Sequence, residues 1–212
     1  MRAPGAVTLR RTPGPADWER VRELCCLTGR SGAPIERERW PFFAEQWIGP
    51  YQKLLPEWAY VAESDGAIVG YLTGCPDTRA FERQRALRFT LPLLARLVFG
   101  GVANADTRRF VKRALRLERG PEGCFERGVL RALARDYPAH LHVNLDERVR
   151  GQGVGRQLIE RFAADLREQT PARGIHVFCG HGPVKFYESV GFRELAAIDY
   201  GTARVFALAR PL

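Results

Sequence analysis

The sequence predicts an α/β domain, and three segments support that prediction. Residues 141–145 alternate apolar and polar side chains, which is typical of a β-strand. A glycine-rich stretch at 151–155 follows, and beyond it apolar residues recur at helical spacing through residue 166. Upstream, the strand-like runs 58–62 and 67–72 flank Ser64-Asp65-Gly66, a favourable hairpin turn. Strands and helices therefore share one chain.

The composition is that of one globular domain spanning residues 1–212. Of these residues 45% are hydrophobic and 27% charged, which is enough apolar material for one sizeable core. The formal net charge of +9 comes almost entirely from arginine. Such a charge describes either a plain solvated surface or a field that attracts an anionic ligand or an acidic partner. The cysteines are odd in number and lack C-x-x-C spacing, so we expect a reducing cytoplasm rather than a disulfide framework.

The remaining elements follow from the same patterns of periodicity and turn residues. We expect strands at 7–10, 175–179, 195–198 and 204–209, and helices at about 15–26, 40–55, 81–137 and 184–190. The segment 40–55 is unusually aromatic, whereas 81–137 is basic, with a helix cap expected at Asp106-Thr107 and a break at 120–123. Gly191 suits the left-handed residue that ends a helix.

Three kinds of binding receive little support from the sequence. His140 and His142 share one face of their strand, but no carboxylate or thiolate is spaced to complete a metal site with them. The longest apolar stretch, 91–105, is too short and too interrupted to span a membrane, and no signal peptide opens the chain. Nucleic-acid binding would need aromatic residues interleaved with arginines, and the basic region offers Phe110 alone, at an apolar position. We therefore expect no metal, membrane or nucleic-acid partner.

The glycine-rich turn between strand and helix is suited to binding an anion. Backbone N–H groups at a helix N-terminus attract phosphate, and glycine lets a diphosphate approach closely. A Walker loop would need Gly-Lys-Ser/Thr, and a dinucleotide fingerprint would need G-x-G-x-x-G. The chain has Gly155-Arg156-Gln157 and glycines at 151, 153 and 155, so it matches neither. What remains is Arg-x-x-Gly-x-Gly, carried by Arg150, Gly153 and Gly155, or else a glycine loop without a ligand.

This pattern resembles the acetyl-CoA-binding motif of the GNAT acyltransferase superfamily. Downstream, Tyr187 and Gly191-Phe192 are similar to the Tyr-x-x-x-Gly-Phe signature of the last GNAT helix, in the same order and at a similar distance. The asparagine that often precedes that tyrosine by seven residues, and contacts CoA, is Gly180 here. The resemblance implies a mixed, mostly antiparallel twisted sheet flanked by helices, with 81–137 as a helical insertion between the third and fourth strands. An insertion of this length usually carries function or covers a site.

A closer resemblance extends over roughly residues 40–192. Residues 56–61 and 70–81 are similar to a bacterial GNAT subgroup, which in turn resembles the acetyltransferase-like domain at the C-terminus of animal O-GlcNAcase. That animal domain is regarded as a pseudo-enzyme that lacks the glycine loop. This chain keeps Arg150, Gly153 and Gly155, so its cofactor site is expected to be intact.

The resemblance implies acetyl-CoA as the cofactor. Its diphosphate would lie on the glycine loop, and its pantetheine arm along the strand edge opened between 141–145 and 175–179. A backbone N–H at a bulge around Asn144-Leu145-Asp146 would hold the thioester carbonyl. The implied cofactor-binding residues are Val143, Leu145, Val149, Arg150, Gly151, Gln152, Gly153, Val154, Gly155, Arg156 and Tyr187.

The same resemblance implies which side chains move protons. Tyr187 would be the general acid that returns a proton to the CoA thiolate, unless it is a core tyrosine whose hydroxyl has a local partner. Asp77, at the end of the third strand, is the candidate base, with Asp146 and Glu147 as alternatives. Each of the three acids could instead be a surface or cap residue, and water could take the proton in their place.

We therefore expect an N-acetyltransferase that moves an acetyl group from acetyl-CoA to an amine of a small molecule or a protein, as a monomer or homodimer. The alternative is a non-catalytic module of the same fold that binds acyl-CoA or a protein partner. The acceptor pocket is expected between Trp47, Tyr51, Asp77 and Phe81, because an acidic group with aromatic walls would suit a cationic amine. The same aromatic residues could instead be plain core.

Overall fold

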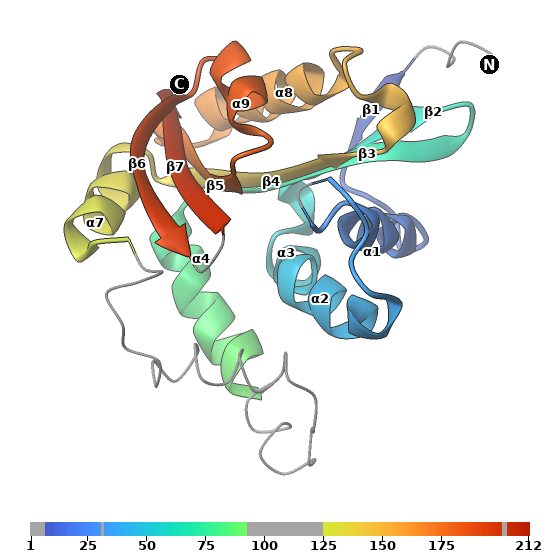
Figure 1. Ribbon diagram of the computed structural model, residues 1–212, viewed down its shortest axis with the longest axis horizontal. Coiled ribbons are helices and arrows are strands. Elements are labelled where there is room, and N and C mark those ends of the chain that lie inside the picture. Colours follow the sequence, from blue (N-terminus) through green and yellow to red (C-terminus); the bar gives the residue numbers. More distant parts are fainter. Residues whose placement is uncertain (1–6, 31, 93–124, 201–202) are drawn as a thin grey trace.

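A twisted sheet between two layers of helices forms the centre of the molecule (Figure 1). The computed structural model describes residues 7–30, 32–92, 125–200 and 203–212. The strands are β1 (Thr8–Arg11), β2 (Ala59–Ser64), β3 (Ala67–Cys75), β4 (Ala139–Leu145), β5 (Gly174–Gly180), β6 (Arg193–Tyr200) and β7 (Ala203–Pro211). Their order in the sheet is β1-β2-β3-β4-β5-β7-β6. Only β4 and β5 run parallel among the neighbours in this described sheet, so the predicted mixed, mostly antiparallel sheet is confirmed.

Helices cover both faces of the sheet. They are α1 (Asp17–Leu27), α2 (Trp40–Trp47), α3 (Gly49–Leu54), α4 (Thr78–Arg85), α7 (Arg127–Asp136), α8 (Val154–Gln169) and α9 (Val184–Ser189). Short 3-10 turns form η1 (Arg37–Arg39), η2 (Pro56–Trp58) and η4 (Glu147–Val149), and a π-helical turn, η3 (Ala86–Thr90), continues α4. In Figure 1, α8 and α9 lie on one face and α1 to α4 on the other. None of the helices in the described ranges combines the length and apolar character that crossing a bilayer requires.

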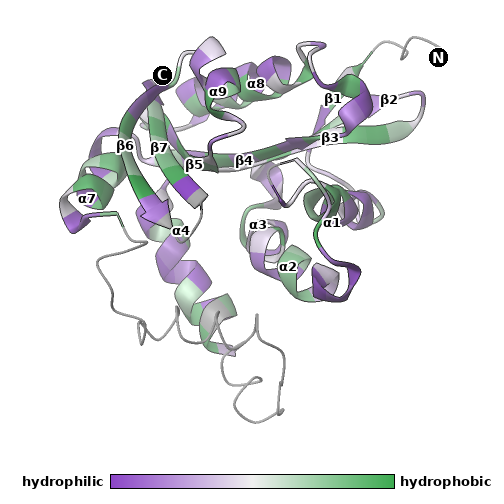
Figure 2. Ribbon diagram, viewed as in Figure 1, coloured by the Kyte–Doolittle hydropathy of each residue, from purple (hydrophilic) through white to green (hydrophobic). Residues whose placement is uncertain are grey.

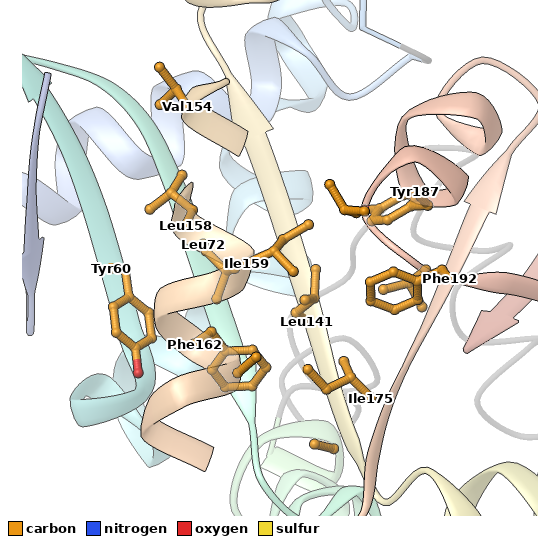
Figure 3. Close-up of a cluster of buried hydrophobic side chains, with 14 of the residues drawn as sticks. Tyr60, Leu72, Leu141, Val154, Leu158, Ile159, Phe162, Ile175, Tyr187 and Phe192 are labelled. Atoms are coloured by element: carbon orange, nitrogen blue, oxygen red, sulfur yellow. The ribbon is translucent and has the colours of Figure 1, made fainter. Parts of the chain in front are cut away.

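The largest part of the core lies between α8 and the sheet. Ile159 and Phe162 of α8 are fully buried, and they pack among Leu72, Leu141 and Ile175 from three adjacent strands (Figure 3). Each such side chain contributes roughly 1.5–3 kcal/mol when it leaves water. The strands accordingly carry mostly hydrophobic colours in Figure 2, whereas α4, which buries Phe81, is largely hydrophilic. This packing fixes the axis of α8 and therefore the position of its N-terminus.

A second cluster anchors the opposite layer. Val21 and Leu24 of α1 pack on Val61 and Tyr71 of the sheet, and all four side chains are almost completely buried. The apolar residues that recur at helical spacing in α1 thus form the stripe that packs against β2 and β3.

Two predicted turns have the expected backbone conformation. The hairpin between β2 and β3 turns at Asp65 and Gly66, with φ of 51° and 74°, as a two-residue hairpin loop requires. Gly191 has φ of 89° and ends α9, and the N–H of Phe192 donates to the carbonyl of Tyr187 at 3.0 Å. Both turns confirm the sequence-based assignment.

The segment between β3 and β4 is described only at its two ends. Helix α4 with η3 leaves β3, and α7 leads into β4, packing Leu133 on β7. The helix expected to begin at Asp106-Thr107, with Phe110, lies outside the described residues, as does the rest of 93–124.

Gly74 of β3 allows α8 to approach the sheet closely. A Cβ at this position would overlap the ring of Phe162, which has no room to move because it is fully buried and packs edge-on against Trp58 and Tyr60. We expect Gly74→Ala to lower the free energy of unfolding by about 1–3 kcal/mol, as overpacking does. Denaturant unfolding measures this change.

Gly128 in α7 provides the matched control, because a Cβ there meets no atom within 4 Å. Gly128→Ala should leave stability unchanged or raise it by up to about 1 kcal/mol. If Gly74→Ala and the parent protein unfolded at the same denaturant concentration, the packing argument would be contradicted.

Candidate active site

The sheet opens between β4 and β5. These parallel strands pair only at Ala139↔Ile175 and His140↔His176. Beyond these pairs β4 keeps its full ladder with β3 and β5 keeps its full ladder with β7, so each strand follows its antiparallel partner. The predicted opening between 141–145 and 175–179 is therefore present.

A cavity of about 800 Å³ occupies this opening. On one face of the sheet it is lined by the loop before α8 and by α9, and on the other by Thr28, Phe43 and Trp47 from the α1–α2 region. Because the two sets of helices lie on opposite faces, the cavity passes through the sheet. Two molecules could therefore meet in it from opposite sides.

The loop before α8 forms an anion cradle at the edge of the cavity. Gly151 and Gly153 have φ of 77° and 79°, and a Cβ on either would meet no protein atom within 4 Å. Gly153 is the N-cap of α8 and offers no side-chain acceptor. The N–H groups of the first turn, Val154 to Arg156, have no intrahelical acceptor and lie at the positive end of the helix dipole. This arrangement suits a phosphate or diphosphate.

Two arginines at the cradle are held by backbone carbonyls. Arg150 donates from Nε to Leu145 O at 3.2 Å and from Nη2 to Gly32 O at 3.1 Å. Arg156 donates from Nη2 to Ser189 O at 2.6 Å, which ties α8 to α9. Both arginines line the cavity and add positive charge to it, Arg156 beside the cradle and Arg150 between the cradle and the loop after α1.

Most of the predicted cofactor-binding residues lie at the cavity, and two do not. Val149 is fully buried in the core, and Gln152 is exposed and donates to Arg148 O at 2.7 Å. The residues that line the cavity are Val143, Leu145, Arg150, Gly151, Gly153, Val154, Gly155, Arg156 and Tyr187.

The expected bulge around Asn144-Leu145-Asp146 is wrong. The register of β4 against β3 is continuous up to Gly70↔Leu145, and the N–H of Asp146 still donates to Val69 O at 2.8 Å. Alternation alone then directs the backbone N–H and C=O groups of Val143 and Leu145 away from β3 and toward the opening. A regular strand edge, rather than a bulge, faces the cavity.

Tyr187 lies at the cofactor end of the cavity. Its side chain is 6% exposed, and its ring centroid lies 5.2 Å from that of Phe186 and 5.4 Å from that of Phe192. Figure 3 shows Tyr187 beside Phe192. Its hydroxyl has no hydrogen-bond partner among the described residues, unlike a core tyrosine with a local partner. Burial raises the pKa of Tyr187 well above its ordinary value, so the phenol stays protonated.

The predicted acids are engaged elsewhere. Asp77 is exposed and caps α4, accepting from the N–H groups of Arg79 and Ala80 at 2.9 and 3.0 Å. Asp146 caps η4, and its hydrogen bond with Arg148 holds its pKa below the usual range. Glu147 is exposed. None of these carboxylates lines the cavity, so we do not retain them as bases.

The four side chains expected around the acceptor do not surround one pocket. Trp47 lines the cavity. Tyr51 and Phe81 instead stack on each other at 4.9 Å, and the hydroxyl of Tyr51 lies 2.8 Å from His140 Nε2. With Asp77 at the surface, the predicted arrangement is wrong, because Tyr51 and Phe81 pack against each other and against His140 of β4 instead.

His142 lines the cavity and was not foreseen there, and Asn144 lines it as well, although only its backbone was expected near the thioester. The ring of His142 lies 5.8 Å from that of Trp47, and Asn144 Nδ2 donates to the hydroxyl of Tyr71 at 2.8 Å. Strand alternation indicates that residues 140, 142 and 144 share a face, but it does not say which helices cover that face. In the described residues no three His, Cys, Asp or Glu side chains are grouped to hold a metal ion.

Burial of two histidines makes stability depend on pH. It lowers the pKa of His140 to about 3 and that of His142 to about 4. The unfolded chain takes up these protons near pH 6.5 and the folded chain does not, so stability falls as the pH drops from about 6.5 to about 4. The expected slope is at most about 1.4 kcal/mol per pH unit for each histidine.

Urea unfolding at about pH 7 and about pH 5 tests this expectation. His142→Gln should reduce the loss of stability between the two conditions. His181→Gln, at an exposed position, should not. The same loss in all three proteins would contradict the assignment.

Comparisons with known proteins agree with this geometry. Residues 118–194 match the model of the acetyltransferase (GNAT) domain. The crystal structure of SsHAT is 26% identical, with a TM-score of 0.68, and the match covers 97% of this chain and 98% of that one. Ard1 from Thermoplasma volcanium is 16% identical with a TM-score of 0.57, covering 98% of each chain. Ribosomal-protein-alanine N-acetyltransferase from Brucella melitensis is 16% identical with a TM-score of 0.54, covering 97% and 99%.

The matches extend over nearly the whole length of each compared chain, and the model match includes the glycine loop and α9. The chain therefore has the GNAT acetyltransferase fold, and within it residues 118–194 match the GNAT acetyltransferase domain.

Proposed function

We propose that this chain is an acetyl-CoA-dependent N-acetyltransferase. The observation that carries the proposal is the cavity through the sheet, with an anion cradle at one end and a separate entrance at the other. Bound acetyl-CoA would supply an acetyl group activated as a thioester. A primary amine entering from the α1–α2 side could attack it directly, without a covalent enzyme intermediate.

The cradle fits the diphosphate of CoA. The space beside Gly151 and Gly153 is open, and the unpaired N–H groups at the start of α8 face an anion there. Arg150 and Arg156 neutralise part of the ligand's charge. Positive φ at both glycines explains why the loop needs these residues even though no protein atom crowds them.

The free edge of β4 would hold the pantetheine arm. Amide groups of the arm could pair with the backbone of Val143 and Leu145, as an added strand pairs with a sheet edge. This contact places the thioester toward the middle of the opening, where the cavity is lined by Tyr187 on one side and by Asn144 on the other.

Tyr187 is the proposed general acid. Its protonated hydroxyl is free of protein partners in the described chain and can donate to the CoA thiolate as that leaves. A module that binds acyl-CoA without turnover would share the cradle, but it would have no use for an unpartnered phenol at the cavity. The position of Tyr187 therefore favours an enzyme over such a module.

We also infer the finer placement of the chain from its residues. Segments 56–61 and 70–81 support membership of the bacterial subgroup that resembles the O-GlcNAcase acetyltransferase-like domain. Buried free thiols at Cys25, Cys26 and Cys75 support a reducing, cytoplasmic setting.

Tyr187→Phe tests the proposed function. Loss of the hydroxyl should lower turnover by about 100- to 10,000-fold, the usual range for general acid–base catalysis, while acetyl-CoA affinity stays within about twofold. Thiol release over a panel of amines measures turnover, and calorimetry measures affinity.

Tyr60→Phe is the matched control. That hydroxyl donates to Asp165 at 2.8 Å, among residues outside the cavity lining, so its loss should cost stability but not turnover. A Tyr187→Phe enzyme as fast as the parent would exclude Tyr187 as the acid.

A further inference from the structure

The acceptor end of the cavity carries no acidic side chain among the described residues, and the cation Arg150 reaches it from the cradle through its hydrogen bond to Gly32 O. Its other titratable groups are Cys25 and His142. Burial raises the pKa of the Cys25 thiol to about 12 and lowers that of His142 to about 4. Both groups are therefore uncharged at neutral pH, and Thr28 and Asn144 beside them are neutral amide or hydroxyl groups.

The charges that do line the cavity are positive. Arg156 lies at the cradle, Arg150 extends from the cradle to Gly32 O on the acceptor side, and no carboxylate accompanies them in the described lining. The whole chain carries a formal net charge of +9. An acceptor with several positive charges would meet repulsion and find no anionic partner inside.

Aromatic rings form the wall of this end. Trp47 is 44% exposed, although it is a large apolar side chain, and its ring lies 6.0 Å from that of Phe43. Phe43 is held in place because it packs against Ile35 and the backbone at Gly29, where a Cβ would come within 2.8 Å of the ring. A flat or aliphatic group can therefore pack on a fixed surface.

We infer that the acceptor is an amine on an aromatic or other apolar body, with no second positive charge, rather than a polyamine or a lysine-rich peptide. The inference rests on the proposed function and names its substrate class. In the reaction the amine nitrogen forms a bond to the acetyl carbon and the carbon–sulfur bond breaks. Water takes one proton from the nitrogen, Tyr187 supplies one to the sulfur and regains one from water, so an amide and a free thiol result.

The lack of an acidic group in the described lining of this end also selects the charge state of the amine. An ammonium group that loses its water there gains no carboxylate, so the uncharged and nucleophilic form binds at less cost. Amines of low pKa are therefore favoured. A lysine side chain, with a pKa near 10.4, is a poorer acceptor at neutral pH than an α-amino group near 8 or an aromatic amine.

Acetyl transfer to four amines tests the inference: 2-phenylethylamine, aniline, spermidine and a short lysine-containing peptide. The parent protein should show kcat/KM for 2-phenylethylamine at least about tenfold above that for spermidine and the peptide. In Trp47→Ala the ratio of kcat/KM for 2-phenylethylamine to that for spermidine or the peptide should fall close to one. In Trp47→Glu the added carboxylate should make spermidine and the peptide the better acceptors.

Trp40→Ala is the control on the same helix. Its indole donates to Ile35 O at 3.1 Å and stands outside the cavity lining, so the order of the amines should not change. Faster reaction of spermidine or the peptide in the parent, or an unchanged ratio in folded Trp47→Ala, would overturn the inference alone. Acetyl-CoA binding without thiol release from any amine would overturn the proposed function and the inference together.

Discussion

The separation of β4 from β5 is the constraint on which the rest of the site depends. Each strand has a complete antiparallel ladder on its outer side, and the two share only the pairs at Ala139 and His140. The start of α8 fits closely between the end of β4 and α9, because a Cβ at Gly155 would meet both Leu145 and Phe186. A side chain at Gly155 would displace one of these contacts. The backbone N–H and C=O groups of β4 that would pair with β5 in a regular sheet face the cavity instead.

Arg150 links the parts that the opening separates. Its guanidinium joins the end of β4, through Leu145 O, to the loop after α1, through Gly32 O. Its own backbone lies in the loop that forms the cradle. The cradle, the strand edge and the entrance on the opposite face therefore share one side chain. In the sequence Arg150 is the first residue of a motif that predicts phosphate binding. In the structure its side chain donates hydrogen bonds to two backbone carbonyls.

Local patterns predicted the features that depend on neighbouring residues. The glycine loop, the hairpin at Asp65 and Gly66, and the helix stop at Gly191 each follow from backbone conformations that few residues tolerate. The same reasoning failed where one residue could either face a ligand or cap a helix. Asp77 follows a strand and also precedes a helix, and its carboxylate bonds with the N–H groups of α4 rather than facing a ligand.

Contacts between distant segments were beyond the sequence patterns. Phe81 is buried and Tyr51 half-buried because α3 and α4 meet beside His140, a contact that no periodicity reveals. The sequence showed only that His142 alternates with its neighbours on one face of a strand. Its place in the cavity depends on the point at which β5 separates from β4. The bulge in β4 was expected from the resemblance to GNAT proteins. In this chain β4 instead pairs with β3 in a continuous register.

Calorimetric titration with acetyl-CoA of two glycine variants tests the central claim, that the loop before α8 holds the diphosphate. Gly153 and Gly66 have similar positive φ, 79° and 74°, and equally open surroundings, but Gly66 lies in the β2–β3 hairpin and is not among the residues that line the cavity. Replacing either by valine imposes the same backbone strain, of about 1–2 kcal/mol. The account predicts that Gly153→Val weakens binding at least about tenfold while Gly66→Val binds as the parent does. Equal affinities for the two folded variants would contradict it.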